Sequence, residues 1–468
     1  MPASALFGTL GIRADASPHI GMGHVMRCLA LAQAWQDRGG KVVLFTDELP
    51  PALKQRLEAE KIEIRASSGL DGECIVLDGY HFTPEQRHAF KQAGRPLLIV
   101  DDLADSDLSA ADLVLNHNAY ATGATYPGQR SLCGSRFTLL RREFASPPPR
   151  TAFSGPAKHV LITMGGSDPN NDTLAVLQQL TAYADLHLRV LIGAANAHAE
   201  SLRALPSIEL LIQPPNLPAI MQQADVAITA AGSTCWELAS LGVPMLLKVI
   251  ANNQQGIADY LVSHAAGRLF DPDALRELLA DAGARQTLAQ NARSLVDGRG
   301  ASRVAENLAC HPLSLRRATL EDARLLLEWA NDPITRQASF NSEPIPWETH
   351  VAWLQRRLND AQCAFYIAED GTQAVGTVRF DHREAGVAEI SLSLAPAARG
   401  RGLGPKLIRL GTFSVLDEGF CTEVRGRVKH SNAPSLRAFE RAVFRKLSQD
   451  TESVEFTATA ASLAAPNE

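Results

Sequence analysis

The sequence predicts an α/β protein with two doubly wound domains, followed by a smaller α+β domain. Up to about residue 310, short β-branched runs alternate with charged or alanine-rich stretches of helical spacing, a pattern typical of βαβ units around a parallel sheet. From about residue 312, strands with alternating apolar residues follow one another, with helical interruptions and a glycine-rich loop. The 468 residues also exceed what one ordinary core can hold. We therefore predict domains at 1–146, 151–308 and 312–468.

Composition and charge narrow the class of protein. Hydrophobic residues make up 46% and charged residues 21% of the chain, which is typical of a water-soluble globular protein. The formal net charge of -6 argues against general binding to nucleic acid or to an anionic membrane. No apolar run approaches the roughly 20 residues needed to cross a bilayer, and MPASALFGTLGIRAD lacks the basic start of a signal peptide. We therefore expect a cytoplasmic protein whose phosphate-bearing ligands are held locally; the pattern does not indicate an oligomeric state.

The 7 cysteines are scattered along the chain. None forms a CxxC motif or a Cys/His pair at metal-ligand spacing. They predict reduced thiols in a reducing compartment, without a disulfide framework or a metal site.

The elements of each domain can be placed in chain order. The strands expected in the first domain are LFGTLGIRA, KVVLFTD, ECIVLDG, PLLIVDD and ADLVLNH. SPPPR at 146–150 ends this series, because prolines cannot donate ladder hydrogen bonds. The second domain continues with HVLITMGG, LRVLIGA, IELLIQ, DVAITAAG and PMLLKVI. The third has LSLRRAT, CAFYIAED, AVGTVRFD and AEISLSLAP, with helices at Leu320–Asn331 and near Trp347–Leu358.

The end of the first strand leads into a glycine turn and a histidine. In HIGMGHVMRC, Gly23 precedes a helix that carries His24 and Arg27 in its first turn. Free N–H groups and the positive end of the helix dipole can hold a phosphate or a hydroxyl-rich ligand, and they favour the neutral imidazole that a general base requires. For this segment alone, a glycine turn with a histidine bonded to the backbone is an equally simple interpretation.

Two loops of the second domain also follow strand ends. TMGGSDPNND places Gly166 and Ser167 where bare backbone can approach a diphosphate. AAGSTCWEL places Ser233 and Thr234 before a helix with Glu237 in its first turn, and this carboxylate could accept both hydroxyls of a ribose. The alternative for the second loop is a capping box formed by Thr234 and Glu237.

The third domain contains a further candidate for diphosphate binding. In SLAPAARGRGLGPKLI, a strand is followed by Arg399, Gly402 and Gly404 at R-x-x-G-x-G spacing and then by a helix. Successive N–H groups in such a loop point at phosphates, and side chains at the glycine positions would obstruct the ligand. KHSNAPSLRAFERAVF then places Asn432 and Ser435 ahead of another helix. For the loop alone, the alternative is an arginine- and glycine-rich surface turn.

Motifs in the first two domains carry a family resemblance. RADASPHIGMGHVMRC, GSRFTLLRREF, TMGGSDPNND, AGSTCWELASLGVPML and IANNQ, in this order, resemble the UDP-sugar hydrolases of pseudaminic acid biosynthesis over about residues 5–305. The resemblance implies a glycosyltransferase-B-like pair of domains and metal-independent release of UDP from UDP-2,4-diacetamido-2,4,6-trideoxy-β-L-altropyranose. It also implies that His24 activates the attacking water, with inversion at the anomeric carbon. Asp15, Tyr80 and Asn253 would line the cleft for the sugar and the nucleotide.

The third domain resembles the GCN5-related N-acetyltransferases, which use acetyl-CoA as co-substrate. The resemblance implies cofactor contacts from the strand end, the loop and the next helix start: Leu394, Arg399, Arg401, Gly402, Leu403, Gly404, Asn432 and Ser435. WANDPITRQASFNSEPIPWETHVAWLQ is similar to the acetyltransferases that modify the 4-amino group of UDP-4-amino-4,6-dideoxy-N-acetyl-β-L-altrosamine. The product of that reaction is the substrate of the hydrolase reaction named above.

Two residues depart from the acetyltransferase pattern. Phe439 stands where many members carry a tyrosine that reprotonates the CoA thiolate, and Val443 replaces the usual glycine. The general acid is therefore unassigned, or unnecessary, because a thiolate with a pKa of about 8.5 can leave unaided. Glu389, on the strand before the loop, is the first candidate for the base that takes the substrate proton, although a surface glutamate is as simple an interpretation. His430 is the second candidate.

These patterns together predict a bifunctional enzyme that acts on UDP-linked amino sugars. One alternative is a hydrolase with an acetyltransferase-like module that only binds. Another is a glycosyltransferase on the same scaffold, which would use an acceptor hydroxyl in place of water. The last is a hydrolase of a UDP-N-acetylglucosamine-type substrate.

Overall fold

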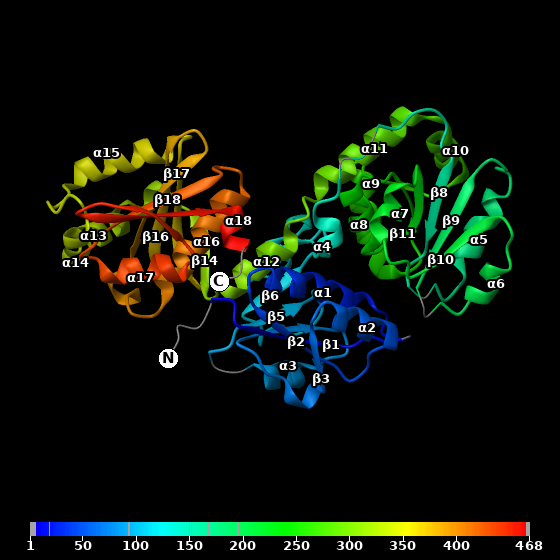
Figure 1. The fold of residues 1–468 in the computed structure, drawn as a ribbon, viewed down its shortest axis with the longest axis horizontal. Coiled ribbons are helices and arrows are strands. Elements are labelled where there is room, and N and C mark those ends of the chain that lie inside the picture. The colour runs from blue at the N-terminus through cyan, green and yellow to red at the C-terminus, as the bar shows by residue number, and fades with distance from the viewer. Residues whose placement is uncertain are drawn as a thin grey trace. The chain divides into compact units, whose positions relative to one another are not determined.

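The computed structural model describes residues 6–17, 19–91, 94–148, 150, 152–166, 168–193 and 196–464, without the side chain of residue 253. The chain forms two compact units (Figure 1). The α/β unit contains Leu10–Ala34 and Val42–Val304, and the C-terminal unit contains Trp35–Lys41, the chain from Ala305 onward and the described residues before Leu10. None of the described helices is both long and apolar enough to cross a membrane.

The first sheet of the α/β unit has the strand order β3-β2-β1-β4-β5-β6-β7. Its strands are β1 (Thr9–Ala14), β2 (Lys41–Phe45), β3 (Glu63–Arg65), β4 (Cys74–Asp78), β5 (Leu97–Val100), β6 (Leu113–Asn116) and β7 (Ser131–Cys133). Its helices are α1 (Gly23–Gln36), α2 (Pro51–Ala59), α3 (Pro84–Phe90) and α4 (Arg142–Ala145), with short 3-10 turns η1 (Ser67–Gly69), η2 (Gly123–Thr125) and η3 (Ser135–Phe137). Strands β4, β5 and β6 are buried at every position, as in a parallel sheet covered on both faces. The strand order reverses between β1 and β4, so this pair marks the switch point of the sheet.

The second sheet repeats this topology in the order β10-β9-β8-β11-β12-β13. Its strands are β8 (His159–Thr163), β9 (His187–Ile192), β10 (Ile208–Ile212), β11 (Val226–Ala230), β12 (Met245–Lys248) and β13 (Arg268–Leu269). The helices are α5 (Asp172–Leu180), α6 (Ala199–Arg203), α7 (Leu217–Gln222), α8 (Thr234–Leu241), η4 (Asn252–Gln254), α9 (Gln255–Ser263), α10 (Pro272–Ala280), α11 (Ala282–Leu295) and α12 (Gly300–Ala309). Phe144 of α4 is fully buried in the same core cluster as Trp236 of α8, so the chain already packs on the second half before the prolines at 147 and 148.

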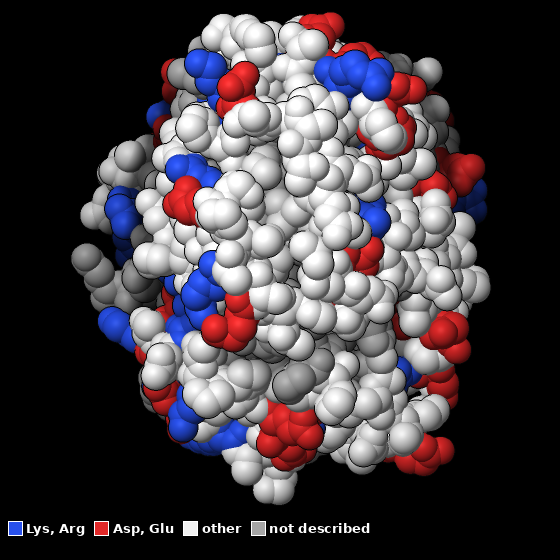
Figure 2. Space-filling model, turned by 90° about the vertical axis from the view of Figure 1, so that its right-hand side faces the viewer, with Lys and Arg blue, Asp and Glu red and all other residues white. Residues whose placement is uncertain are grey.

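Charged residues on the face drawn in Figure 2 are mixed in sign and surround a broad uncharged middle. This face offers no extended positive field. A diphosphate bound there would therefore depend on local amides and single side chains.

The sheet of the C-terminal unit has the order β14-β15-β16-β17-β18-β20-β19. Its strands are β14 (Leu313–Arg317), β15 (Cys363–Asp370), β16 (Gln373–Glu384), β17 (Val387–Leu394), β18 (Glu423–Lys429), β19 (Arg445–Gln449) and β20 (Ser453–Thr459). The helices are η5 (Leu320–Asp322), α13 (Ala323–Asn331), α14 (Pro333–Ala338), α15 (Trp347–Leu358), η6 (Pro396–Ala398), α16 (Leu403–Asp417), α17 (Ala433–Arg441) and α18 (Ala460–Ala464). All neighbouring strands run antiparallel except β17 and β18, which are parallel.

A buried ion cluster lies inside the C-terminal unit. The fully buried carboxylate of Glu306 accepts from Arg38 Nε at 2.6 Å and from Arg409 Nε and Nη2 at 2.9 and 2.8 Å. The Arg409 guanidinium lies 4.8 Å from the centre of the Phe7 ring, and the Trp35 indole donates to the Gly8 carbonyl at 2.9 Å. Residues near the start of the chain are therefore part of the core of this unit.

The architecture confirms the predicted order of two doubly wound α/β halves followed by an α+β sheet. All the strands named from the sequence are present, and the three sheets fall within 1–146, 151–308 and 312–468, although these domain bounds themselves stay a prediction. The sequence analysis missed β3, β7 and β13, which have only two or three residues, and the last three strands of the chain.

Candidate active sites

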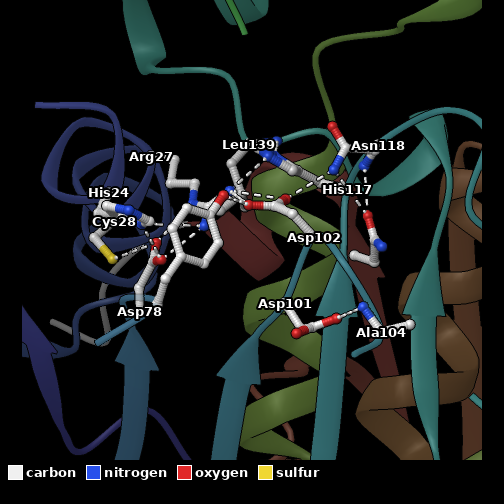
Figure 3. A network of polar contacts seen from close by, with 12 residues as sticks. His24, Arg27, Cys28, Asp78, Asp101, Asp102, Ala104, His117, Asn118 and Leu139 are labelled. Atoms are coloured by element: carbon white, nitrogen blue, oxygen red, sulfur yellow. Dashed lines mark hydrogen bonds and ion pairs between the residues drawn. The ribbon is translucent and has the colours of Figure 1, made fainter. Parts of the chain in front are cut away.

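Polar side chains gather at the carboxyl edge of the first sheet (Figure 3). Asp78 is the last residue of β4, Asp102 lies two residues after β5, and His117 directly follows β6. His24 and Arg27 lie in the first turns of α1, which follows β1. Because the strands are parallel, their carboxyl ends lie along one edge, and β1 and β4 flank the switch point. The cluster therefore lies where doubly wound sheets bind ligands.

His24 and Arg27 both bind the buried carboxylate of Asp78. His24 Nδ1 lies 2.7 Å from Asp78 Oδ1, and Arg27 contacts Oδ2 through Nε at 2.6 Å and Oδ1 through Nη2 at 2.7 Å. Although burial disfavours the charged carboxylate, the charge and hydrogen bonds of Arg27, with the hydrogen bond of His24, hold the pKa of Asp78 well below its usual range. An ionised carboxylate only accepts, so His24 donates from Nδ1 and carries its lone pair on Nε2 when neutral.

The Nε2 atom of His24 is available to take a proton. Within the described part of the chain, no hydrogen bond to this nitrogen is recorded, although the side chain as a whole is buried. Arg27 Nη2 also approaches His24 Nδ1, at 3.2 Å. Both groups are donors in the arrangement above, so we attribute this approach to their shared acceptor, Asp78.

Asp102 connects Arg27 to the exposed side of the cluster. Its Oδ2 lies 2.7 Å from Arg27 Nη1 and accepts from the Tyr80 hydroxyl at 2.5 Å, and its Oδ1 accepts from Asn118 Nδ2 at 2.7 Å. Tyr80 is half exposed, and its ring meets the His24 ring edge-on with centroids 4.7 Å apart. The structure thus places Tyr80, a predicted site residue, directly beside the candidate base.

His117 lies buried behind Arg27. Its Nε2 is 3.4 Å from Arg27 Nη1, and its Nδ1 is 3.3 Å from the Leu139 backbone nitrogen. Burial lowers the pKa of His117 to about 4, and the positive charge of Arg27 acts in the same direction. His117 is therefore neutral near pH 7. Sequence reasoning missed it, together with Asp78, Asp102 and Asn118.

Asp15 has several partners within the protein. Its Oδ1 accepts from Arg13 at 2.6 Å, from the Thr46 hydroxyl at 2.9 Å and from the Asp47 N–H at 2.8 Å, and its Oδ2 lies 3.0 Å from His81 Nε2. Although burial raises it, the hydrogen bonds from Arg13 and Asp47 lower the pKa of Asp15 to about 2. Asp15 joins the loops after β1 and β2, and its contact with a ligand stays a prediction.

The glycine loop after β8 presents bare backbone. Gly165 has a φ of +85° with open space around it, and a Cβ at Gly166 would lie 3.4 Å from Met22 Cε. Ser167 lies outside the described residues. The Asp168 carboxylate accepts from the N–H groups of Asp172 and Thr173 at the start of α5. These bonds anchor the loop to the helix that follows it.

The amino end of α8 has no side-chain cap. Ser233 is its N-cap residue but makes no capping hydrogen bond. Glu237 instead binds Arg141 Nη2 at 2.7 Å. The capping box considered for Thr234 and Glu237 is therefore wrong. The Cys235 and Trp236 N–H groups donate to the Gly232 and Ser233 carbonyls at 3.0 and 3.1 Å. The side chain of Asn253 lies outside the described residues.

In the C-terminal unit, the two parallel strands diverge. They pair only at Val387–Glu389 with Glu423–Arg425, whereas β17 continues to Leu394 and β18 to Lys429. Among the described residues, no pairing joins their carboxyl-terminal halves. The backbone edges of both strands are therefore open to a ligand beside the glycine-rich loop.

The glycine-rich loop has the conformation that a diphosphate cradle needs. Gly400 and Gly402 have φ values of +77° and +74°, and nothing lies within 4 Å of a Cβ built on either residue. Gly402 is the N-cap of α16 and makes no side-chain capping hydrogen bond, so the first turn of the helix begins directly after this open backbone. Leu403, which is buried, begins this helix, and a Cβ at Gly404 would make only ordinary contacts with Ala438.

Both loop arginines are engaged by carboxylates. Arg399 Nη2 lies 2.7 Å from Asp332 Oδ1 and donates to the Thr335 hydroxyl at 2.9 Å. Arg401 Nη2 lies 2.5 Å from Asp370 Oδ2. Their predicted contacts with the cofactor stay predictions.

The second cofactor motif forms the start of α17. Asn432 is the N-cap, and its Oδ1 accepts from the Ser435 N–H at 3.2 Å. Ser435 therefore lies inside the first turn of the helix and not ahead of it. Leu394 is the last residue of β17.

The candidate acetyltransferase bases have partners of their own. Glu389 Oε2 lies 2.5 Å from Arg383 Nε, at a position where β17 still pairs with β18. His430 Nε2 lies 2.9 Å from the Asp450 carbonyl. Proton removal by either residue stays a prediction.

The two departures from the acetyltransferase pattern have different structural consequences. Phe439 is a core residue, stacked on Phe456 with centroids 5.2 Å apart and edge-on to Phe444 at 5.0 Å. It has no proton to give. Val443 has a φ of +67°, a left-handed conformation that a β-branched residue adopts only with strain.

Known protein families match both the α/β part and the C-terminal part of the chain. Residues 158–315 match the glycosyltransferase family 28 C-terminal domain, and residues 313–445 match the acetyltransferase (GNAT) domain. The chain is 25% identical over 264 residues to the UDP-2,4-diacetamido-2,4,6-trideoxy-beta-L-altropyranose hydrolase of Campylobacter jejuni, covering 53% of this chain and 94% of that protein. It is 31% identical over 339 residues to the UDP-N-acetylglucosamine--N-acetylmuramyl-(pentapeptide) pyrophosphoryl-undecaprenol N-acetylglucosamine transferase of Xanthomonas campestris, covering 61% of this chain and 78% of that protein. The chain belongs to the family of UDP-sugar enzymes that includes this Xanthomonas campestris transferase, and it carries a GNAT acetyltransferase domain.

One relative is similar to this chain over nearly its full length. An uncharacterized protein of Methanocaldococcus jannaschii is 22% identical over 484 residues, covering 95% of this chain and 98% of that protein. The structure of AAC(6')-Ib in complex with ribostamycin and coenzyme A covers 32% of this chain and 94% of its own, at 21% identity and a TM-score of 0.30. The predictions of the fold class and of an enzyme with a UDP-sugar module and a GNAT domain are confirmed.

Proposed function

We propose that the UDP-sugar module hydrolyses UDP-2,4-diacetamido-2,4,6-trideoxy-β-L-altropyranose and that the GNAT domain supplies this substrate by N-acetylation. The acetyl acceptor would be UDP-4-amino-4,6-dideoxy-N-acetyl-β-L-altrosamine, with acetyl-CoA as donor. The observation that carries the hydrolase reaction is the His24–Asp78 pair at the switch point, with Nε2 of His24 available. The named activity of the Campylobacter jejuni relative supports the choice of substrate.

In the hydrolase reaction, His24 acts as the general base. Nε2 takes a proton from a water as the water oxygen bonds to the anomeric carbon, and the bond from this carbon to the UDP oxygen breaks. The attack comes from the face opposite UDP, so the configuration inverts. Asp78, 2.7 Å from Nδ1, stabilises the imidazolium and fixes the ring. Because UDP is a good leaving group, a positioned water and a base are sufficient.

The second half of the module is suited to hold UDP. The bare backbone at Gly165 and Gly166 and the N–H groups of Ser233 and Thr234 at the amino end of α8 can bond the diphosphate oxygens. Arg141 holds the Glu237 carboxylate at 2.7 Å, where it can accept the ribose hydroxyls. Charge that develops on the departing UDP then meets donors that are already oriented.

In the GNAT domain, the open glycine loop fits the diphosphate of acetyl-CoA, and the edges of β17 and β18 fit its extended arm. Acetyl-CoA supplies an activated thioester. The acceptor amine bonds to the thioester carbonyl carbon, the carbon–sulfur bond breaks, and the thiolate leaves with its electron pair. The proton lost by the amine passes to a base, for which Glu389, directly or through water, is the first candidate.

A mass-spectrometric time course tests both steps. The full chain is given the 4-amino nucleotide sugar and acetyl-CoA in water labelled with heavy oxygen. We expect the acetylated nucleotide sugar to appear first, followed by free sugar that carries the label and by unlabelled UDP. Label in UDP would overturn attack at the anomeric carbon. UDP release only after addition of an acceptor alcohol would indicate a glycosyltransferase, and an unacetylated substrate would indicate a GNAT domain that only binds.

A further inference from the structure

The segment between α13 and α15 contacts the glycine-rich loop after β17 and the end of β18. After β17, Arg399 binds Asp332 and Thr335 at the start of α14. At the end of β18, the Lys429 ammonium donates to the carbonyl of Ser339, just after α14. This segment therefore links the loop after β17 to the end of β18, beside the place where acetyl-CoA is proposed to lie. An acceptor that reaches the acetyl group from this side meets the segment first.

The loop that follows α14 holds an aromatic side chain in an exposed position. Phe340 is 57% exposed. The loop is nevertheless ordered, because Arg336 donates to the carbonyls of Ala330, Asn341 and Glu343 at 2.5, 3.1 and 3.3 Å. Because Arg336 holds the loop through its backbone carbonyls, the exposed Phe340 ring forms a preformed surface. Packing in the core of the domain does not explain the position of this ring.

Two cations of β18 lie against this ring. Arg427 Cζ and Lys429 Nζ are each 5.2 Å from the ring centroid. Arg427 shares its charge with Asp450 at 3.0 Å, whereas the recorded hydrogen bond of Lys429 goes to an uncharged carbonyl. An aromatic face with adjacent positive charge suits a ligand that has a flat ring and an anionic group. A polycationic acceptor would meet like charges here.

We propose that Phe340, Arg427 and Lys429 bind the nucleoside diphosphate part of the acetyl acceptor. The pyrimidine ring stacks on Phe340, and the diphosphate lies against Lys429 and Arg427, which directs the sugar amine toward the ends of β17 and β18. This assignment rests on the proposed function, because it takes a nucleotide sugar as the acceptor. It also adds a second uridine nucleotide site to the one in the UDP-sugar module.

Fluorine NMR on the full chain tests the site without requiring turnover. 4-Fluorophenylalanine is placed at position 340, and UDP, uridine and inorganic pyrophosphate are titrated separately. We expect UDP to shift the signal at the lowest concentration, with uridine and pyrophosphate weaker. Lys429→Met should weaken UDP binding by roughly 10- to 150-fold, as expected for the loss of one charged contact. The absence of a shift with millimolar UDP, or a response to pyrophosphate as strong as to UDP, would overturn the proposal.

Acetyl-transfer kinetics complete the test. Phe340→Ala should raise the KM for the 4-amino nucleotide sugar by roughly 5- to 100-fold, the range expected for one lost stacking contact, with little change in kcat. Ile334→Ala is the matched control, since Ile334 is an exposed apolar residue of the same segment that has no ring to stack. A fluorine shift without acetyl transfer to this sugar would refute the proposed function and leave the site intact. Acetyl transfer with an unchanged KM in Phe340→Ala would refute the site alone.

Discussion

Removal of the Glu306 carboxylate should strongly destabilise the C-terminal unit. Glu306→Gln keeps the shape of the side chain but removes the charge that Arg38 and Arg409 share. Both arginines are almost fully buried, with side-chain exposures of 7% and 1%. Two guanidinium groups would then lie in the core without their common anion.

The magnitude follows from the burial of all three groups. Breaking a buried ion pair by removing one partner costs about 3–5 kcal/mol, mostly because the remaining charge is left uncompensated. One kcal/mol shifts the melting temperature of a unit of this size by about 2–4 °C. We therefore expect Glu306→Gln to lower the melting temperature of the C-terminal unit by about 6–20 °C.

Differential scanning calorimetry with and without acetyl-CoA measures this effect, because a ligand of the GNAT domain raises only the transition of that unit. Asp297→Asn, which removes a half-exposed partner of Arg303 in the α/β unit, is the matched control. A loss below about 1 kcal/mol in Glu306→Gln would refute the reasoning, since exposed ion pairs contribute only that much. A fragment that begins at residue 312 lacks both Arg38 and Glu306 and should also melt early.

The contribution of Glu306 to the stability of the C-terminal unit should depend on pH. Although burial disfavours the charged form, the charges of Arg409 and Arg38 hold the pKa of Glu306 below its usual range. The stability that Glu306 contributes is therefore fully present above the unfolded pKa of about 4.3 and is lost as the pH falls through the lower folded value. Wild type and Glu306→Gln should converge in stability at acidic pH.

The other predictions concern the two sites and the strained residue. Asp78→Asn should lower UDP release by about a thousandfold or more, because the amide cannot accept hydrogen bonds from both His24 and Arg27. Acetyl transfer by the same preparation is the internal control, and retained hydrolysis would contradict the role of the His24–Asp78 pair. Gly402→Glu should abolish binding of acetyl-CoA in calorimetric titration, and Gly419→Glu, which has a similar φ of +71° and open surroundings, should not. Val443→Gly should stabilise the protein by about 0.5–1 kcal/mol, because about 1–2 kcal/mol of left-handed strain is relieved against the conformational entropy of glycine. The neighbouring Ala442→Gly, at a φ of -82°, should destabilise it, and equal effects of the two changes in thermal unfolding would contradict the strain.

The parts of the fold that were predictable are those that depend on local sequence. Buried parallel strands such as Leu97–Val100 read as continuous apolar runs, because both faces of the sheet are covered. The strand Arg268–Leu269 has only two residues and no pattern to detect. Strand β18, EVRGRVK, has charged residues on one face and a central Gly426, so its sequence resembles a surface loop.

The candidate site was predictable only where a residue belongs to a recognisable motif. His24 lies in such a motif, but its partner Asp78 is distant in sequence and meets it only through the order of the strands. A usable signal existed, since the strands end as VLDG, IVDD and VLNHN, with a polar group after each apolar run. Arg399 shows the reverse case. Its glycine-rich loop was predictable from the motif, but its ion pair with Asp332 was not, because Asp332 lies far earlier in the sequence.

The charges of the His24 cluster indicate which part of the substrate it receives. Arg27 is the only permanent cation among the described members of the network around Asp78, and its single charge faces the two carboxylates of Asp78 and Asp102. Both carboxylates have lowered pKa values and are ionised near neutral pH, so before His24 takes a proton they outweigh the single charge of Arg27. A diphosphate would be repelled there, whereas positive charge that develops at the anomeric carbon as UDP leaves would be stabilised. The bare backbone at Gly165 and Gly166 and the amino end of α8, where Arg141 binds the Glu237 carboxylate, suit a diphosphate better, which agrees with the proposal that the sugar binds at the first sheet and UDP at the second.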